Sequence, residues 1–324
     1  MNTVYSFGEA LIDFHGIADG PAPVFTAHPG GAPANVAVAT ARLGGRAAFV
    51  GMLGRDIFGD LLLHELSSAG VDTQYTRRTD AAHTALAFVA HTTQGERSFS
   101  FYRPPAADLL FTPSDFDAAT FAPGSIFHAG SCSMSEPAAA AATLYGMSQA
   151  HAVGALVSFD MNLRSALWPH GEDPAPTIWR ALALADCVKL SAEELAFLAA
   201  SAGSESDAFA RLWTGAAQLV LVTDRDRPIR WLTPTTHGAY PAFAARAVDT
   251  TGAGDAFIAG CLYGLARAGI EPRSLSAFAA SSERVGRLLR FAAACGALAV
   301  MRAGSFSAMP TLAEVEALLE TQAA

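Results

Sequence analysis

The stretch Ala247-Val-Asp-Thr-Thr-Gly-Ala-Gly-Asp-Ala-Phe-Ile-Ala-Gly260 has the most specific pattern in the chain. A short apolar lead-in reaches Asp249, and Gly252-Ala253-Gly254 then opens a run that predicts a helix to about Ala268. Glycines have no Cβ to block a ligand that approaches the backbone. The first N–H groups of a helix have no partner within it and lie at the positive end of its dipole, so this stretch predicts an anion site. Asp255 lies one residue into that site, where a carboxylate can take a proton from an attacking hydroxyl.

The plainer interpretation of the same residues is a helix start with an acidic residue in its first turn. Acidic residues are common there because they complement the helix dipole, and Gly-x-Gly alone is a weak signal. The stretch by itself does not separate these two interpretations. The remainder of the chain has to decide between them.

Composition indicates a folded protein with a large core. Of the 324 residues, 51% are hydrophobic and 16% charged, which suits one large or two modest α/β domains. The formal net charge is −9 with no basic block, so we expect no broad binding to nucleic acid or anionic membranes. No signal-peptide pattern and no long uncharged apolar run are present, so we expect a cytoplasmic protein without a membrane span. The four cysteines form no Cys-x-x-Cys pair, which favours reduced thiols over structural zinc.

Strand and helix patterns alternate along most of the chain. The apolar run Val4 to Asp13 predicts a first buried strand with Asp13 at its carboxyl end, where open α/β sheets bind ligands. Repeated strand–helix units predict a doubly wound, mostly parallel central sheet with helices on both faces. Further strands are expected at 47–53, 126–129, 155–160, 187–190 and 219–223, with a hairpin at 229–232 and 238–243. Helices are expected at 36–43, after Gly59 as far as about 69, and at 136–150, 174–184, 192–201, 205–216, 253–268, 273–300 with a break, and 311–321.

One part of the chain departs from this alternation. His83 to His91 and Arg97 to Tyr102 have strand patterns, separated by a turn at 92–96. Together with the Gly- and Pro-containing part at about 14–28, they predict a small antiparallel β-sheet that covers the site. We therefore expect a single domain, 1–324, with lid segments at about 14–28 and 73–107. An edge hairpin without function is the plainer alternative.

Four features, of which the last belongs to the stretch quoted above, occur in a recognisable order over nearly the whole length. They are Gly8-Glu-Ala-Leu-Ile-Asp13 with Gly30-Gly-Ala-Pro-Ala-Asn35, Gly51-Met-Leu-Gly-Arg-Asp-Ile-Phe-Gly59, Phe159-Asp-Met-Asn-Leu-Arg164, and Asp249-Thr-Thr-Gly-Ala-Gly-Asp255. In this order the chain resembles the ribokinase-like, or PfkB-type, carbohydrate kinases, and among them the bacterial fructokinases. Each motif alone is modest evidence, whereas the ordered set is specific.

The resemblance implies a doubly wound α/β fold with a β lid, and transfer of the γ-phosphate of ATP to a sugar hydroxyl. Fructose, phosphorylated at its 6-hydroxyl, is the substrate that we expect. Asp255 is the implied base, and Gly252, Ala253 and Gly254 are the implied anion hole for the phosphoryl oxygens. The implied sugar contacts are Asp13, Gly31, Asn35, Arg103, Arg164 and Asp255. The implied nucleotide contacts are Lys189, Thr223, Arg225, Gly252, Gly254 and Ala294.

Several of these residues also have structural interpretations. Asp13 is compatible with a strand-end turn, Asn35 with a helix cap, and Arg103 or Arg164 with a solvated surface charge. Ala294 lies in a helix expected to border the adenine, where small residues leave room for a flat ring, although core packing is their commoner use.

Two metal ions are implied by the resemblance. Mg²⁺ is expected to bind through nucleotide phosphates and water, with Glu194 as an outer-shell candidate; Glu194 is equally compatible with a helix-start acid. A K⁺ site beside the anion hole is also expected, mostly from backbone carbonyls. Its positions are Asp249, Thr251, Ala299, Arg302 and Gly304.

The segment Thr223-Asp-Arg-Asp-Arg-Pro228 departs from the family pattern. Relatives usually have Thr-x-Gly-x-x-Gly here, and both glycines are replaced, by Arg225 and Pro228. Either Arg225 reaches a phosphate directly, or the turn is reshaped and binds nucleotide more weakly.

Alternatives to a fructokinase remain open at this point. A 2-keto-3-deoxygluconate kinase has an acidic substrate, which Arg103 would favour. A catalytically weak sugar- or nucleotide-binding relative would fit the missing glycines but has no need of Asp255. Apolar positions on the lid strands favour a homodimer formed through the lids.

Overall fold

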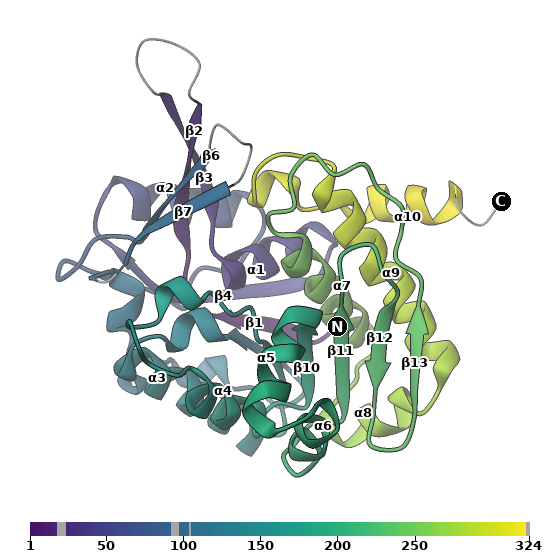
Figure 1. Ribbon diagram of the computed structural model, residues 1–324. Helices are drawn as coiled ribbons and strands as arrows, with labels where there is room; N and C mark the ends of the chain where they lie inside the picture. The colour runs from purple at the N-terminus through teal and green to yellow at the C-terminus, as the bar shows by residue number, and fades with distance from the viewer. Residues whose placement is uncertain (18–23, 92–96, 104, 322–324) are drawn as a thin grey trace.

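The computed structural model describes residues 1–321 except 18–23, 92–96 and 104. It contains a nine-stranded central sheet and a four-stranded sheet that stands above its upper edge (Figure 1). The strands are β1 (Thr3–Phe7), β2 (Leu11–Ile17), β3 (Val24–Gly30), β4 (Arg46–Gly54), β5 (Thr76–Thr79), β6 (Leu86–His91), β7 (Arg97–Tyr102), β8 (Ile126–Gly130), β9 (Leu156–Asp160), β10 (Cys187–Ser191), β11 (Leu219–Thr223), β12 (Ile229–Leu232) and β13 (His237–Tyr240). The helices are α1 (Ala32–Arg42), α2 (Ile57–Ser68), α3 (Pro137–Ala152), α4 (Ala175–Leu182), α5 (Ala192–Ala202), α6 (Glu205–Trp213), α7 (Ala253–Arg267), α8 (Pro272–Ala279), α9 (Ser282–Val300) and α10 (Leu312–Thr321).

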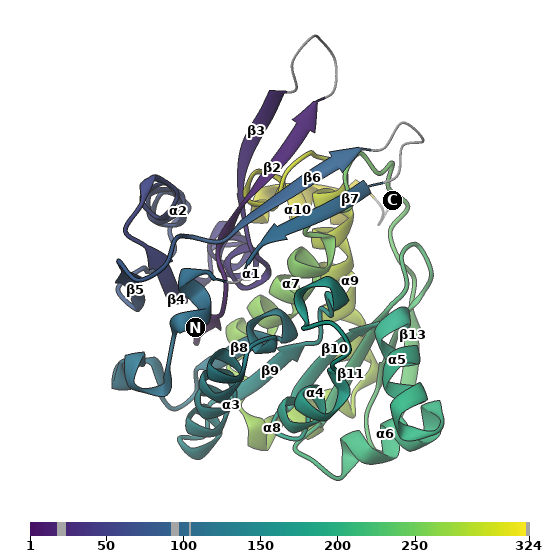
Figure 2. The same cartoon turned by 60° about the vertical axis from the view of Figure 1, so that its left-hand side comes forward.

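The central sheet has the order β13-β12-β11-β10-β9-β8-β1-β4-β5. All neighbours from β11 to β5 are parallel, and only β12 and β13 are antiparallel. Helices cover both faces, which confirms the doubly wound class expected from the alternating pattern (Figure 2).

Alternate residues of each central strand enter two separate cores. On β11, Leu219 and Leu221 pack in one core with α1, α7 and α9, whereas Val220 and Val222 pack in the other with α3 to α6. Successive side chains of a strand point to opposite faces, so a strand buried on both faces must be apolar throughout. This is why β11 is a continuous Val/Leu run up to Thr223.

The first apolar run forms two strands instead of one. β1 ends at Phe7 in the central sheet, and the chain passes through Gly8 (φ 144°) into β2 of the small sheet. A Cβ at Gly8 would lie 2.2 Å from Ser133 Oγ and 2.7 Å from Pro33 Cγ, so the chain can turn closely only with glycine here. Asp13 therefore lies on a lid strand and not at the end of a central strand. The prediction failed because residues 4–12 are buried without interruption across both strands, and hydrophobicity does not reveal a change of sheet.

The small sheet, which we call the lid, has the strand order β3-β2-β6-β7. β6 and β7 form the expected antiparallel pair, while β2 and β6 are parallel. The expected turn at 92–96 lies outside the described residues. The segment at 73–79 is a correction, because β5 pairs with β4 at the edge of the central sheet. Its sequence, Thr76-Arg-Arg-Thr79, is polar and half-buried, so no apolar pattern distinguished it from the lid.

Candidate active site

The start of α7 has the geometry predicted for an anion site. Gly252 precedes the helix in the left-handed conformation (φ 75°), and no side chain caps the first turn. A Cβ at Gly252 would lie 2.7 Å from Met309 Cε, and one at Gly254 would lie 2.9 Å from Lys189 Nζ. The first N–H groups of α7 thus lie in a narrow space beside an ammonium group. This arrangement suits an anion.

Asp255, in the first turn of α7, is held by two amide side chains. Asn35 of α1 donates to its Oδ2 at 2.7 Å, and Asn162, after β9, approaches its Oδ1 at 3.3 Å. Burial raises the pKa of Asp255, and the two amides, Lys189 and Arg164 oppose that rise. The other polar atom of Asn35, Oδ1, is buried and has no hydrogen-bond partner among the residues that the structure describes. The carboxylate is therefore fixed in orientation beside an amide oxygen that has spare hydrogen-bonding capacity.

Asp13 lies beside this group at the base of the lid. A Cβ at Gly30, next to Gly31 before α1, would meet Asp13 Oδ2 at 2.5 Å and Ser305 Oγ at 3.3 Å. Burial and the carboxylates of Asp249 and Asp255 raise the pKa of Asp13 to about 7. Gly31 itself is left-handed (φ 103°), and a Cβ there would clash with the backbone of Glu9 at 2.6 Å. Structure thus brings Asp13, Gly31, Asn35 and Asp255 together.

Two cations lie near these carboxylates. Lys189 Nζ is 3.0 Å from Asp160 Oδ2, and both side chains are buried. Burial alone would lower the pKa of Lys189, but the Asp160 carboxylate raises it above its ordinary value, so the ammonium stays charged. Arg164 is exposed, and its charge lowers the pKa of both Asp13 and Asp255. The charge of Arg164 therefore acts on the carboxyl groups of both halves of the site.

Glu194 has both carboxylate oxygens bound to backbone. One accepts from the N–H of Leu163 at 2.8 Å, and the other accepts from the N–H of Ser191 at 2.7 Å in a capping box at the start of α5. Glu194 thus fixes the loop that carries Asn162 and Arg164. Among the described residues, no group of three or more His, Cys, Asp or Glu side chains could hold a metal ion. This donor set suits a metal that is bound mainly through a ligand's own phosphates.

Arg103 differs from the substrate contact that the sequence predicted. It is 6% exposed, and its Nε donates to Asp108 Oδ2 at 2.8 Å while its Nη1 donates to the carbonyl of Cys132 at 2.9 Å. A guanidinium occupied in this way is not available to a sugar. The sequence did not reveal the pairing because Asp108 lies beyond the end of the strand, in the short 3-10 helix Ala107–Leu110.

The segment after β11 places Arg225 in a left-handed conformation (φ 53°). Its Nη2 lies 3.1 Å from Glu193 Oε1, and both side chains are 83% exposed. Thr223 Oγ1 donates to the carbonyl of Leu190 at 3.4 Å. The position thus retains the backbone shape that suits glycine, but it carries a long side chain that lies on the surface.

The segments expected to form a K⁺ site do lie together. The carboxylate of Asp249 accepts from the N–H groups of Thr251 at 2.9 Å and of Gly304 at 3.2 Å. It therefore joins the loop before α7 to the loop after α9, and Ala299 lies in the last turn of that helix. Arg302 is directed away, to an ion pair with Glu314.

Ala294 is fully buried in the core beneath α7, so it offers no surface to a nucleotide. Its neighbour Gly296 is half-buried, and a Cβ there would lie 3.3 Å from the carbonyl of Ala253. Gly296 is thus the small residue that borders the start of α7.

The contact that sequence reasoning missed is that of Asn162 with Asp255. Asn162 was part of the Asp160-x-Asn162-x-Arg164 element but had no role assigned. Its left-handed backbone (φ 39°), which asparagine tolerates better than most residues, was not visible in the sequence.

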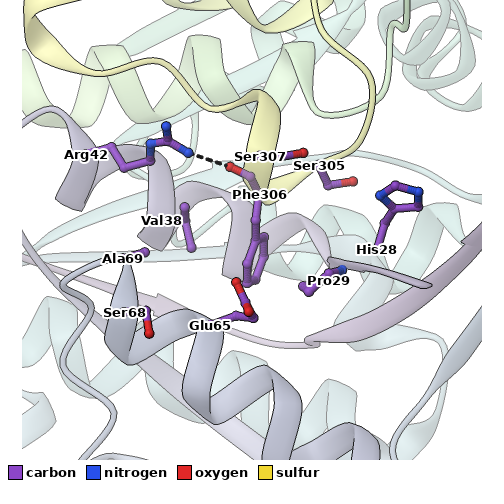
Figure 3. Close-up of a pocket in the computed structure, with 10 residues that line it drawn as sticks. All are labelled: His28, Pro29, Val38, Arg42, Glu65, Ser68, Ala69, Ser305, Phe306 and Ser307. Carbon is purple, nitrogen blue, oxygen red and sulfur yellow. Dashed lines mark hydrogen bonds between the residues drawn. The ribbon is translucent and has the colours of Figure 1, made fainter. Parts of the chain in front are cut away.

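A separate cavity of about 420 Å³ adjoins the base of the lid, between β3, α1, α2 and the loop after α9 (Figure 3). Arg42 donates there to the carbonyl of Phe306 at 3.0 Å. The cavity is lined by His28, Pro29, Val38, Arg42, Glu65, Ser68, Ala69, Ser305, Phe306 and Ser307. Ser305 also lies beside Asp13, so this cavity adjoins the candidate site, although Asp255 itself does not line it.

The arrangement of an anion site, a fixed carboxylate and a lid can now be compared with known proteins. The model of the pfkB family of carbohydrate kinases matches residues 1–312. The chain belongs to this family. This pfkB family kinase is 50% identical to a fructokinase of Xylella fastidiosa solved with bound ATP, with 99% of both chains covered and a TM-score of 0.95.

Two further relatives agree with this assignment. A fructokinase double mutant of Vibrio cholerae O395, solved with fructose, ADP and a potassium ion, is 33% identical over 98% of both chains, with a TM-score of 0.87. Fructokinase-1 of Zea mays is 42% identical over 98% of this pfkB family kinase and 97% of its own length.

Proposed function

We propose that this pfkB family kinase is an ATP-dependent fructokinase, which transfers the γ-phosphate of ATP to the 6-hydroxyl of fructose. The observation that carries the proposal is the fixed carboxylate of Asp255 in the first turn of α7, between an anion site and Asp13. The fructokinase relatives, of which one was solved with ATP and another with fructose and ADP, support this choice of substrates.

In this proposal, Asp255 orients the sugar hydroxyl and accepts its proton as that hydroxyl attacks the γ-phosphate. Asn35 and Asn162 hold both carboxylate oxygens, so the base is oriented before substrate binds. The N–H groups at Gly252, Ala253 and Gly254 stabilise the charge that spreads over the phosphoryl oxygens. Lys189, beside Gly254, adds a positive charge on the same side.

The sugar is held, in the same proposal, by Asp13, Gly31, Asn35 and Arg164. A carboxylate can accept two hydroxyl hydrogen bonds, and the unpartnered Oδ1 of Asn35 can accept another. Gly31 allows the sugar to approach the backbone, because its positive φ and the nearby Glu9 carbonyl exclude a side chain. Arg103 is no longer proposed as a sugar contact, because it is buried against Asp108.

The nucleotide is expected to contact Lys189, Thr223 and the start of α7, with Gly296 in place of Ala294 beside it. Mg²⁺ would be held mainly by the phosphates and water, where it neutralises their charge. Glu194 then acts through the loop that it fixes and not as a ligand. K⁺ is proposed between the loops joined by Asp249, near Thr251, Ala299, Arg302 and Gly304, and the potassium-bound fructokinase of Vibrio cholerae O395 supports this ion.

At the scale of the chain, we infer one kinase domain that carries the lid, and a homodimer formed through the lids. Aromatic rings at the surface of the lid support this inference. The ring centroid of Phe88 lies 5.7 Å from that of Phe25 and 4.9 Å from that of Tyr102. Phe25 is 46% exposed and Tyr102 is 66% exposed. Among the described residues no helix has the length and apolar character needed to cross a membrane. We propose a cytoplasmic location and no nucleic-acid partner, in keeping with a small-molecule enzyme of negative charge.

The test is an assay of purified protein with ATP and Mg²⁺ against a panel of sugars. We expect the highest kcat/KM with fructose, and fructose 6-phosphate as the product. If kcat/KM is higher for 2-keto-3-deoxygluconate than for fructose, then 2-keto-3-deoxygluconate is the substrate. That alternative depended on Arg103 as a cation for an acidic sugar, and the burial of Arg103 weakens it.

Sugar binding without turnover of any sugar would instead indicate a binding protein. The missing glycines at Arg225 and Pro228 favoured this alternative. The left-handed backbone of Arg225 argues against it, because the turn keeps its shape without glycine.

A further inference from the structure

The two ends of the lid meet at one short segment of the body. The lid begins after Glu9 and ends at Arg103, and both side chains are buried and bonded to the turn Ser131–Met134 that follows β8. Arg103 Nη1 donates to the carbonyl of Cys132 at 2.9 Å, and Ser133 Oγ donates to Glu9 Oε2 at 2.8 Å. The two ends of the lid, at Glu9 and Arg103, are therefore hydrogen-bonded to neighbouring residues of the same turn.

From Cys132 the contacts continue to Asp255. The thiol of Cys132 donates to the carbonyl of Asn162 at 3.3 Å, and the side chain of Asn162 donates to Asp255 Oδ1 at 3.3 Å. Burial raises the pKa of the Cys132 thiol, so it stays protonated and can donate. A series of hydrogen bonds thus connects Arg103 to Asp255 through Cys132 and Asn162.

The other end of the lid, at Glu9, is connected to the other carboxylate oxygen of Asp255, Oδ2. Glu9 Oε1 accepts from the N–H of Ala32 at 3.3 Å, at the first residue of α1. One turn further, Asn35 donates to Asp255 Oδ2 at 2.7 Å. Each carboxylate oxygen of Asp255 is therefore held by an amide side chain, and the position of that amide depends on one end of the lid.

We propose that Arg103 and Cys132 are positioning residues, which set the orientation of Asp255 through Asn162 and thereby couple the lid to the base. Asp108 keeps Arg103 in place, since its Oδ2 lies 2.8 Å from Nε and 2.5 Å from Nη2 of the guanidinium. The proposal rests on Asp255 being the base. It assigns a role in turnover to two residues that touch no substrate.

The first test uses Cys132, because its backbone contact with Arg103 survives substitution of the side chain. Cys132→Ala removes the donor to Asn162, and we expect kcat to fall by roughly three- to tenfold with KM for the sugar nearly unchanged. Cys132→Ser restores a donor and should recover most of kcat. Cys187→Ala is the control: this thiol is equally buried but lies at the amino end of β10, and the variant should keep its kcat.

The second test removes the charged pair at the Arg103 end of the lid. Arg103→Met with Asp108→Leu removes both members of the pair, so neither is left as a buried charge without the other, and the melting temperature shows whether folding survives. We expect kcat to fall by about tenfold or more, because the anchor of Cys132 is lost. The control, Arg230→Met with Glu205→Leu, makes the same substitutions in a partly exposed ion pair of 2.6 Å between β12 and α6 and should leave kcat unchanged.

All rates are measured with whichever sugar the wild-type protein turns over best, so an error in the choice of fructose does not affect the result. The proposal is wrong if Cys132→Ala behaves like Cys187→Ala, or if Cys132→Ser is no better than Cys132→Ala. It is also wrong if the Arg103/Asp108 double variant keeps wild-type kcat. A wild-type protein that turns over no sugar would overturn the proposed function together with this inference.

Discussion

At the scale of single residues, the environment of Asp255 separates catalysis from binding. Asp255→Asn keeps the size of the side chain but removes the base, so we expect kcat to fall by roughly 10²- to 10⁴-fold. Sugar affinity should largely survive, because Asp13, Asn35 and Arg164 remain. Steady-state kinetics and calorimetric titration with fructose measure the two effects. Turnover near that of the wild type would remove Asp255 from its role.

Asp13 gives a prediction about pH. Its pKa in the folded protein is raised to about 7, above that of an unfolded aspartate, so the folded state holds this proton more tightly. Its contribution to stability is therefore fully present below the unfolded pKa of about 4 and is lost as pH rises through about 7. Asn cannot ionise, so Asp13→Asn should be more stable than the wild type at about pH 8, by roughly 2–4 °C in Tm.

Melting curves of both proteins between about pH 4 and pH 8 measure this difference, which should shrink toward the acidic end. The same variant should raise KM for fructose, since it loses a double acceptor. Equal Tm values for the two proteins at every pH would show that Asp13 has an ordinary pKa.

At the scale of the elements, the turn after β11 carries Arg225 where the family usually has glycine, and the effect of this replacement can be measured. Arg225 is left-handed and is bound on the surface to Glu193, so Arg225→Gly removes backbone strain and side-chain bulk together. We expect KM for ATP to fall by about two- to fivefold, as the backbone of the turn becomes accessible. Arg227→Gly, in the same turn and paired with Asp224, is the control. An unchanged KM for ATP in Arg225→Gly would make Arg225 a bystander, and a rise would mean that it binds phosphate.

The two loops joined by Asp249 predict a response to monovalent cations. The ion would lie beside the start of α7 and strengthen its positive field, so its removal should weaken the anion hole. We expect kcat in potassium chloride to exceed that in tetramethylammonium chloride by about tenfold at equal ionic strength. The melting temperature in both salts is the control for unfolding. Identical kcat values in both salts would exclude a cation site that affects turnover.

At the scale of the whole molecule, the exposed aromatic rings of the lid predict its oligomeric state. Phe25→Ser with Tyr102→Ser removes two rings that are largely exposed, so the folded monomer should lose little stability. We expect the wild type to be a dimer by light scattering and the double variant to be mainly monomeric. Val153→Ser changes an exposed apolar residue at the end of α3 and should remain dimeric. A monomeric wild type at micromolar concentration would contradict a lid-mediated dimer.

Sequence alone was sufficient for the alternation of strands and helices from β8 to α7 and for the start of α7. Both depend on local patterns: apolar runs of strand length, helical periodicity, and glycines at Gly252 and Gly254 before Asp255. These patterns act within a few residues, so they can be recognised without knowing the partners of any side chain.

Only the tertiary structure decided the sheet that contains Asp13, the burial of Arg103 and the two amides that hold Asp255. The amides lie 220 and 93 residues from Asp255 in the chain, at Asn35 and Asn162. A polar side chain binds whichever partner the packed backbone brings within reach, and no local pattern records that choice. The start of α7 at Gly252 was therefore predictable from the sequence, whereas the orientation of Asp255 depends on the packing of α1, α7 and the loop after β9.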